Sequence, residues 1–132
     1  MINPQKLRVM LVEDDPNDVE LTLRVLRRNN LDQNLSLASD GVEALECLDN
    51  LSKSNSDLPD LILLDIYLPR IGGIELLERL KKDSRFSNIP VVMLTGSVMS
   101  EHIQKCYDLG AITYLLKNIS EDELMTVLSY LT

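Results

Sequence analysis

The chain has 132 residues, which is the size of one ordinary domain and enough to form a hydrophobic core. Thirteen Lys and Arg against 21 Asp and Glu give a net charge of −8, which argues against a nucleic-acid binder because phosphate neutralisation needs a basic face. No apolar stretch approaches the roughly 18 residues that a membrane span needs, and the first residues are not a signal peptide. We therefore expect a cytoplasmic protein with no membrane partner.

Five short apolar runs alternate with amphipathic stretches along the chain. The runs are residues 7–12, 35–39, 60–65, 90–95 and 111–116. Repeated alternation of this kind predicts an α/β fold with a mostly parallel sheet covered by helices on both faces. The two cysteines, Cys47 and Cys106, occur singly in helical patterns, where we expect core packing and no disulfide.

The first amphipathic stretch is ambiguous. Its apolar residues alternate, which is a strand signal: Val19, Leu21, Leu23 and Val25. Pro16 directly after Asp15 nevertheless fits the start of a helix. Acidic residues come early and arginines late, as a helix dipole prefers, so we predict a helix here.

The later stretches have clearer helical spacing. Their apolar stripes are Val42, Leu45, Leu48 and Leu51, then Ile74 and Leu77, then Met99, Ile103, Cys106 and Tyr107. Gly110 is placed to end the third of these helices. Residues 120–131 form the clearest helix, with Ser120 and Glu123 as a capping box. The polar residues 52–57 are interpreted as a surface loop and not as a domain boundary.

Polar side chains stand where the apolar runs end. The first run is followed by Glu13, Asp14 and Asp15, the second by the turn signal Ser39-Asp40-Gly41, the third ends in Asp65, the fourth in Thr95, and Lys117 follows the fifth. Parallel strands bring these ends to one edge of the sheet. Clustered carboxylates repel unless a cation joins them, and hard oxygen ligands suit Mg²⁺ better than zinc. A lysine and a threonine beside such a site suit a phosphoryl group, which Asp65 would accept as nucleophile.

Each of these residues also has an ordinary structural interpretation. Asp65 could be a turn or N-cap residue, and Glu13 with Asp14 could cap the helix that follows. Lys117 could be a solvated surface charge, and Thr95 a plain strand residue. Their joint placement at the ends of apolar strands favours a functional site.

Four stretches closely resemble the receiver domain of two-component response regulators. They are "VEDD" at 12–15, "LILLDIYLPRIGGIELL" at 61–77, "IPVVMLTG" at 89–96 and "DLGAITYLLKN" at 108–118. The resemblance implies a flavodoxin-like (βα)5 three-layer sandwich with strand order 2-1-3-4-5. It also implies that residues 1–132 are a single receiver domain with no output domain.

The resemblance assigns a metal site and a phosphoacceptor. Asp65 would accept the phosphoryl group. Mg²⁺ would be held by Glu13, Asp14, Asp65 and the backbone carbonyl of Tyr67. The family usually has an aspartate where Glu13 stands, and it tolerates the exchange.

The remaining roles concern contact with the phosphoryl group and the switch. Lys117 would contact the phosphoryl oxygens, and Thr95 would turn toward them. Tyr114 would swing inward as Thr95 moves, which makes a two-state switch. The resemblance thus implies a phosphoacceptor signalling protein that assists its own phosphotransfer and dephosphorylation, not an enzyme acting on other substrates.

The resemblance also implies partners. The donor would be a phosphohistidine on a bacterial sensor histidine kinase or a histidine phosphotransfer protein. The signal would pass to a downstream protein effector, and a homodimer through the last helix is an option. The opening "EDDPND" and the polar loop before the third run are similar to stand-alone receivers that serve phytochrome-type sensor kinases.

Two departures from the family pattern bear on function. Asn118 stands where the family usually has a proline, commonly after a cis peptide bond, so the Lys117–Asn118 peptide could be cis or trans. Tyr67 is bulkier than the residues usual at its position, and we expect it to shield an acyl phosphate from water.

Three other functions fit the same architecture less well. A receiver-like binding module that is never phosphorylated usually lacks an acidic residue, the Asp or the Lys, and only Asn118 favours it. A flavodoxin-type flavin protein needs a phosphate-cradling loop where this chain has "EDDPND". A hydrolase with an Asp nucleophile needs a second acid two residues later, where Tyr67 stands.

Overall fold

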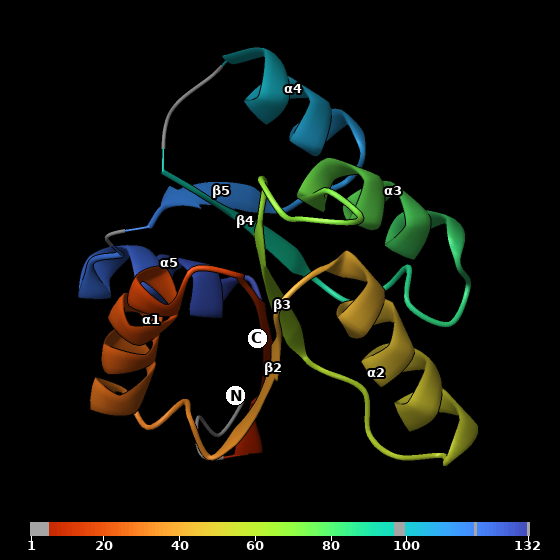
Figure 1. Cartoon of the computed structure of the whole chain (residues 1–132). Helices are drawn as coiled ribbons and strands as arrows, with labels where there is room; N and C mark the ends of the chain where they lie inside the picture. The colour runs from red at the N-terminus through yellow and green to blue at the C-terminus, as the bar shows by residue number, and fades with distance from the viewer. Residues whose placement is uncertain (1–5, 97–99, 118, 132) are drawn as a thin grey trace.

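A parallel sheet forms the centre of the molecule. The computed structural model describes residues 6–96, 100–117 and 119–131. The strands are β1 (Arg8–Val12), β2 (Asn34–Ala38), β3 (Leu61–Asp65), β4 (Val91–Thr95) and β5 (Thr113–Leu116). The helices are α1 (Pro16–Arg28), α2 (Gly41–Lys53), α3 (Gly73–Lys82), α4 (Ser100–Asp108) and α5 (Glu121–Ser129). The strand order β2-β1-β3-β4-β5 confirms the prediction (Figure 1).

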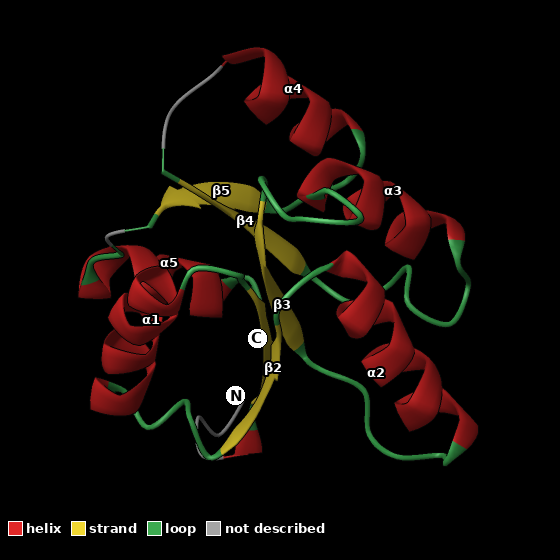
Figure 2. Ribbon diagram, viewed as in Figure 1, coloured by secondary structure: helices red, strands yellow, loops and turns green. Residues whose placement is uncertain are grey.

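Helices cover both faces of this sheet, and a separate core lies under each layer. Successive side chains of a strand point to opposite faces. Met10 and Ile62 therefore pack with residues of α2, α3 and α4 on one face. Leu11 and Leu63 pack with residues of α1 and α5 on the other. Figure 2 shows the sheet between these two layers, which is the three-layer sandwich expected from the sequence.

The stretch whose apolar residues alternate like those of a strand is a helix, α1, as predicted. The Asp15 carboxylate accepts hydrogen bonds from the backbone N–H groups of Asn17 and Asp18, and Pro16 follows as the first helical residue. Val25 and Leu26 are buried against the sheet. The N-cap and the packed face decide the conformation here, and the local alternation of apolar residues does not.

Two other helix ends were predicted nearly to the residue. Ser120 caps α5 and forms the expected capping box with Glu123, so the helix proper runs from Glu121 to Ser129 and not over 120–131. Gly110 has a φ of 101° just beyond α4, a conformation in which a side chain would be strained. The apolar stripe of α4 was expected to include Met99, which lies outside the described residues.

The segment after β2 was interpreted only as a turn, and the structure corrects this. Asp40 is the N-cap of α2, and its carboxylate accepts a hydrogen bond of 2.8 Å from the backbone N–H of Glu43. Aspartate serves turns and N-caps by the same local hydrogen bonding, which is why the sequence alone did not separate them. The helix continues to Lys53, so the polar loop expected at 52–57 begins two residues later.

Two expectations from composition concern the cysteines and the membrane. Cys47 and Cys106 are free thiols, and Cys106 is buried in the core while Cys47 packs against it. Among the described residues, no helix has the length and apolar character that crossing a bilayer requires.

Candidate functional site

Three carboxylates meet at the carboxyl edge of the sheet. Glu13 and Asp14 directly follow β1, and Asp65 is the last residue of the neighbouring β3. One carboxylate oxygen from each lies within 4.8 Å of the others. Glu13 and Asp65 are buried, with 4% and 1% exposure, whereas Asp14 is exposed. The predicted cluster is therefore formed, with two acids inside the protein and one at its surface.

Lys117 places its ammonium among these acids. The Nζ atom lies 3.1 Å from Asp65 Oδ2 and 3.1 Å from Glu13 Oε2. A third carboxylate, that of Asp18 in the first turn of α1, accepts the shortest of the three contacts at 2.8 Å. The backbone N–H of Lys117 also donates to the Thr95 carbonyl, which ties the end of β5 to the end of β4.

Asp18 was not singled out from the sequence as a site residue. An acid in the first turn of a helix is fully explained by the helix dipole, so its type and position gave no further signal. It comes near Lys117 only because the fold brings the first turn of α1 beside the residue that follows β5, 99 residues later in the sequence.

Burial dominates the electrostatics of the two inner acids. Burial raises the pKa of Glu13 to about 7, and the nearby Asp65 charge adds to the effect, although the Asp15 N–H and Lys117 oppose it. Burial also raises the pKa of Asp65, against the hydrogen bonds from Lys117 and from the backbone N–H of Tyr67. Both groups are thus held in surroundings that disfavour their charged forms.

The same surroundings favour the charged form of Lys117. Burial alone lowers the pKa of its ammonium, but hydrogen bonds and charges of Asp18, Asp65 and Glu13 outweigh burial and raise it. The ammonium is therefore charged at neutral pH, and it partly compensates the acids around it.

Thr95 and Tyr114 lie on the side of Asp65 away from β1. Asp65 is paired in register with Leu94, so Thr95 stands one residue beyond it at the end of β4, fully buried. Tyr114 is partly buried in β5, and its ring packs edge-on against Tyr107 of α4 with centroids 6.2 Å apart. Thr95 therefore stands at the strand end next to the one that carries Asp65, and Tyr114 contacts α4 from the neighbouring strand β5.

The loop from β3 to α3 begins directly after Asp65 and is fixed at Arg70 and at Gly73. The Arg70 guanidinium donates two hydrogen bonds, of 2.8 and 3.0 Å, to the Asp40 carboxylate across the neighbouring loop. A Cβ atom on Gly73 would lie 2.0 Å from the Asp65 carbonyl oxygen, so only glycine fits at the start of α3. This loop carries Tyr67, whose hydroxyl forms a 2.6 Å hydrogen bond with His102 Nδ1 of α4.

The donor set suits a hard divalent cation. The cluster offers carboxylate oxygens from the ends of two adjacent strands, which are the ligands that Mg²⁺ and Mn²⁺ prefer, and all three of its members are acids. The buried acids also gain from a second positive charge, because Lys117 alone leaves their pKa values raised. The residues present therefore fit a divalent metal ion.

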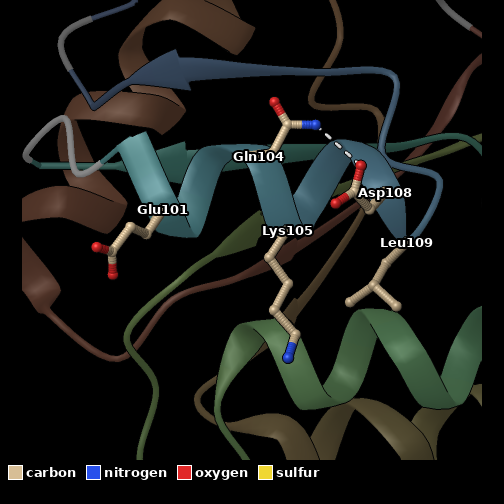
Figure 3. A pocket seen from close by; sticks show the side chains of 5 residues that line it. All are labelled: Glu101, Gln104, Lys105, Asp108 and Leu109. Carbon is tan, nitrogen blue, oxygen red and sulfur yellow. Dashed lines mark hydrogen bonds between the residues drawn. The ribbon is translucent and has the colours of Figure 1, made fainter.

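A hollow elsewhere on the surface plays no part in this arrangement. This groove of about 660 Å³ lies beside α4. Figure 3 shows the side chains that line it, which are Glu101, Gln104, Lys105, Asp108 and Leu109. Its side chains include the hydrogen-bonded pair Gln104 and Asp108. None of its lining residues belongs to the acidic cluster, so the chemistry of the strand ends and not the size of a hollow locates the site.

Comparison with known protein families identifies the family of the chain that carries this acidic cluster. The family described as "Response regulator receiver domain" matches residues 9–129. The chain belongs to this family. The receiver domain shares 37% identity over 117 residues with the response regulator Rcp1 of Synechocystis sp., covering 88% of this chain and 79% of Rcp1. The resemblance stated from the sequence motifs is thereby confirmed.

Solved structures agree with the family assignment. The bacteriophytochrome response regulator AtBRR superposes with a TM-score of 0.83 at 34% identity, covering 96% of this receiver and 93% of AtBRR. The phosphorylated cyanobacterial phytochrome response regulator RcpA gives 0.77 at 32% identity, with 94% and 89% coverage. A Mn²⁺-bound form of Rcp1 gives 0.74 at 32% identity, with 93% and 90% coverage. The comparisons and the acidic cluster together indicate divalent metal binding by receivers of this kind.

Proposed function

We propose that this receiver accepts a phosphoryl group on Asp65 in a Mg²⁺-dependent reaction and passes the signal to a protein partner. The observation that carries the proposal is the Lys117 ammonium held 3.1 Å from a buried Asp65 carboxylate, beside two further acids. A site with a nucleophilic carboxylate, a fixed cation and metal ligands is suited to phosphoryl transfer.

The phosphoryl group would come from a phosphohistidine of a sensor histidine kinase or a phosphotransfer protein. An Asp65 carboxylate oxygen attacks phosphorus, the phosphorus–nitrogen bond breaks, and its electron pair leaves with the imidazole, which takes a proton. Glu13, Asp14, Asp65 and the backbone carbonyl of Tyr67 would hold Mg²⁺, which neutralises charge on the transferred oxygens. The similarity to RcpA and AtBRR extends the proposal to a phytochrome-type sensor kinase.

The chain's own residues then stabilise and report the product. The Lys117 ammonium donates to a phosphoryl oxygen, and the Thr95 hydroxyl donates to another. Movement of Thr95 vacates space beside Tyr114, and rearrangement of this residue changes the surface of β5 and α4 that a downstream protein effector or a second copy would contact.

Tyr67 would lengthen the life of the acyl phosphate. Its half-exposed ring belongs to the second residue after Asp65 and is fixed to α4 by the hydrogen bond to His102, and there it would limit the approach of water to the acyl phosphate. We expect Tyr67→Asn to speed hydrolysis of the phosphorylated protein several-fold, measured as loss of the phosphorylated mass after removal of the donor. An unchanged decay rate would contradict this role.

Intact mass after incubation with Mg²⁺ and acetyl phosphate tests the proposed function. We expect a gain of one phosphoryl group that is absent without Mg²⁺ and absent in Asp65→Asn. A folded wild-type protein that gains no phosphoryl group would overturn the proposal and favour a binding module that is not phosphorylated.

A further inference from the structure

The ammonium of Lys117 has three hydrogens, and three carboxylates surround it. Asp18 Oδ2 lies 2.8 Å from Nζ, closer than the oxygens of Asp65 or Glu13 at 3.1 Å. An ammonium is a three-hydrogen donor, so these contacts use its full donor capacity. Lys117 must therefore give up at least one of them before it can donate to a phosphoryl oxygen.

Two of the three carboxylates would be metal ligands, and the third would not. Glu13 and Asp65 belong with Asp14 to the cluster that suits a divalent cation, and Asp18 does not. A bound cation would draw lone pairs of Glu13 and Asp65 toward itself and repel the ammonium beside it. The Asp18 carboxylate, whose side chain is 27% exposed and which is not part of that cluster, would keep its lone pairs for Lys117.

We infer that Asp18 is a positioning residue, which keeps the Lys117 ammonium at the phosphoacceptor when a divalent metal has taken the oxygens of Glu13 and Asp65. One ammonium hydrogen stays on Asp18, and the other two become available for phosphoryl oxygens. The inference rests on the proposed function, and it gives this first-turn acid a role that its helix position does not require.

The competing explanation is that Asp18 only stabilises α1. Acids in the first turn interact favourably with the helix dipole by about 0.3–1 kcal/mol, whatever lies nearby. Glu43 provides a matched control, because it is the third residue of α2 as Asp18 is the third residue of α1. Glu43→Gln and Asp18→Asn each remove one negative charge from the same helical position.

The first test reads the order of the Lys117 side chain by NMR of protein labelled with ¹³C-lysine. In the Mg²⁺-bound wild type and in Glu43→Gln, the two ε hydrogens of Lys117 should give separate resonances, because the side chain is held. In Mg²⁺-bound Asp18→Asn they should merge into one averaged signal. Separate resonances in all three proteins would overturn the inference, whether or not the protein is phosphorylated.

The second test measures phosphorylation by acetyl phosphate at saturating Mg²⁺. Asp18→Asn should lower the maximal rate about tenfold, the size expected for one lost charge-assisted hydrogen bond, while Glu43→Gln leaves it unchanged. Asp18→Glu, which restores the carboxylate, should recover part of the rate. The Kd for Mg²⁺ should change much less than the rate, because Asp18 is not a ligand.

The outcomes separate the inference from the proposed function. Wild-type protein that is phosphorylated at the same rate as Asp18→Asn overturns only the role of Asp18. Wild-type protein that is not phosphorylated overturns the proposed function, and the NMR comparison still decides whether Asp18 holds Lys117 in the metal-bound protein.

Discussion

Lys117 and Lys81 are both partly buried lysines, yet they have opposite surroundings. Lys81 Nζ donates to two neutral backbone carbonyls, those of Ser87 at 3.2 Å and Ile89 at 2.9 Å. Among the residues that the structure describes, the partners of Lys117 Nζ are all carboxylates. Burial lowers the pKa of Lys81, whereas carboxylates raise the pKa of Lys117 although burial opposes them.

The difference separates Lys117, which we propose to be functional, from a lysine with a structural role. Lys81 closes the turn between α3 and β4, and its partners lie six and eight residues along the chain. Lys117 meets acids 52, 99 and 104 residues away, which come together only because β1, β3 and the start of α1 meet beside it in the folded chain. Burial of a lysine is therefore no sign of chemistry by itself, whereas convergence of opposite charges from separate elements is.

Replacing each lysine by methionine should give the largest contrast in phosphorylation. Lys117→Met removes the cation that faces the transferred phosphoryl group, and we expect the rate with acetyl phosphate and Mg²⁺ to fall by about 10²- to 10³-fold. Lys81→Met, far from the acidic cluster, should leave the rate within twofold of wild type. Comparable losses in both variants would break the distinction between the two lysines.

The same variants should differ in stability without metal. Lys117→Met leaves the buried acids Glu13 and Asp65 without their cation, at an expected cost of about 3 kcal/mol in the free energy of unfolding. Lys81→Met loses hydrogen bonds to carbonyls and should cost about 1 kcal/mol. Urea unfolding with and without Mg²⁺ checks this, because Mg²⁺ should recover stability in Lys117→Met relative to its metal-free form and change the Lys81→Met deficit little.

The contributions of Lys117 and Lys81 to the free energy of unfolding should change in opposite directions as the pH becomes alkaline. The folded pKa of Lys117 lies above its ordinary value of 10.5, so its stabilising contribution is complete below that pH and is lost as pH rises through the folded pKa. The folded pKa of Lys81 lies below 10.5, so between the two values the unfolded chain binds more protons and stability rises with pH.

Free energies of unfolding between about pH 8 and pH 11, taken as differences between wild type and each methionine variant, measure these slopes. The wild-type advantage over Lys81→Met should grow with pH in the window below 10.5. The advantage over Lys117→Met should persist through that window and decline only above it. Parallel curves for the two lysines would show that their surroundings do not differ as described.

A smaller effect on stability is expected when Arg70, which forms an ion pair with Asp40, is replaced. Its side chain is 57% exposed, and its φ of 64° lies in the left-handed region, which favours glycine over arginine. Arg70→Ala loses the ion pair with Asp40 and keeps the strained backbone, so it should cost about 1 kcal/mol. Arg70→Gly relieves the backbone and should cost less. The reverse order in urea unfolding would show that the φ at this position is not strained.

The strand ends could be predicted from the sequence because they depend on local pattern. Apolar runs fix where strands stop, and parallel pairing then brings Glu13, Asp65 and Lys117 to one edge without further information. Asp18 could not be predicted in this way, since its position in a helix already has a sufficient local explanation. The hydrogen bond between Tyr67 and His102 was also missed, because it depends on how α4 packs.

The residues at which helices begin were harder to predict than the helices themselves, because tertiary contacts decide them as well. The sequence around Asp40 is typical of a turn. Only the structure shows that Asp40 caps α2 and also forms an ion pair with Arg70. The peptide between Lys117 and Asn118, where the sequence left cis and trans open, involves a residue outside the described part of the chain. These features depend on tertiary contacts that no local pattern encodes.

Identifying the residue that carries the phosphoryl group tests the central claim most directly. An aspartyl phosphate is reduced by borohydride to homoserine, so the protein treated with Mg²⁺ and acetyl phosphate can be reduced, digested and sequenced by mass spectrometry. The account predicts homoserine at position 65 and at no other acid of the cluster, with none formed when Mg²⁺ is omitted. Homoserine at position 14 or 18, the five-carbon product 2-amino-5-hydroxypentanoic acid at position 13, or no reduced residue in a folded protein that was treated with Mg²⁺ and acetyl phosphate, would contradict it.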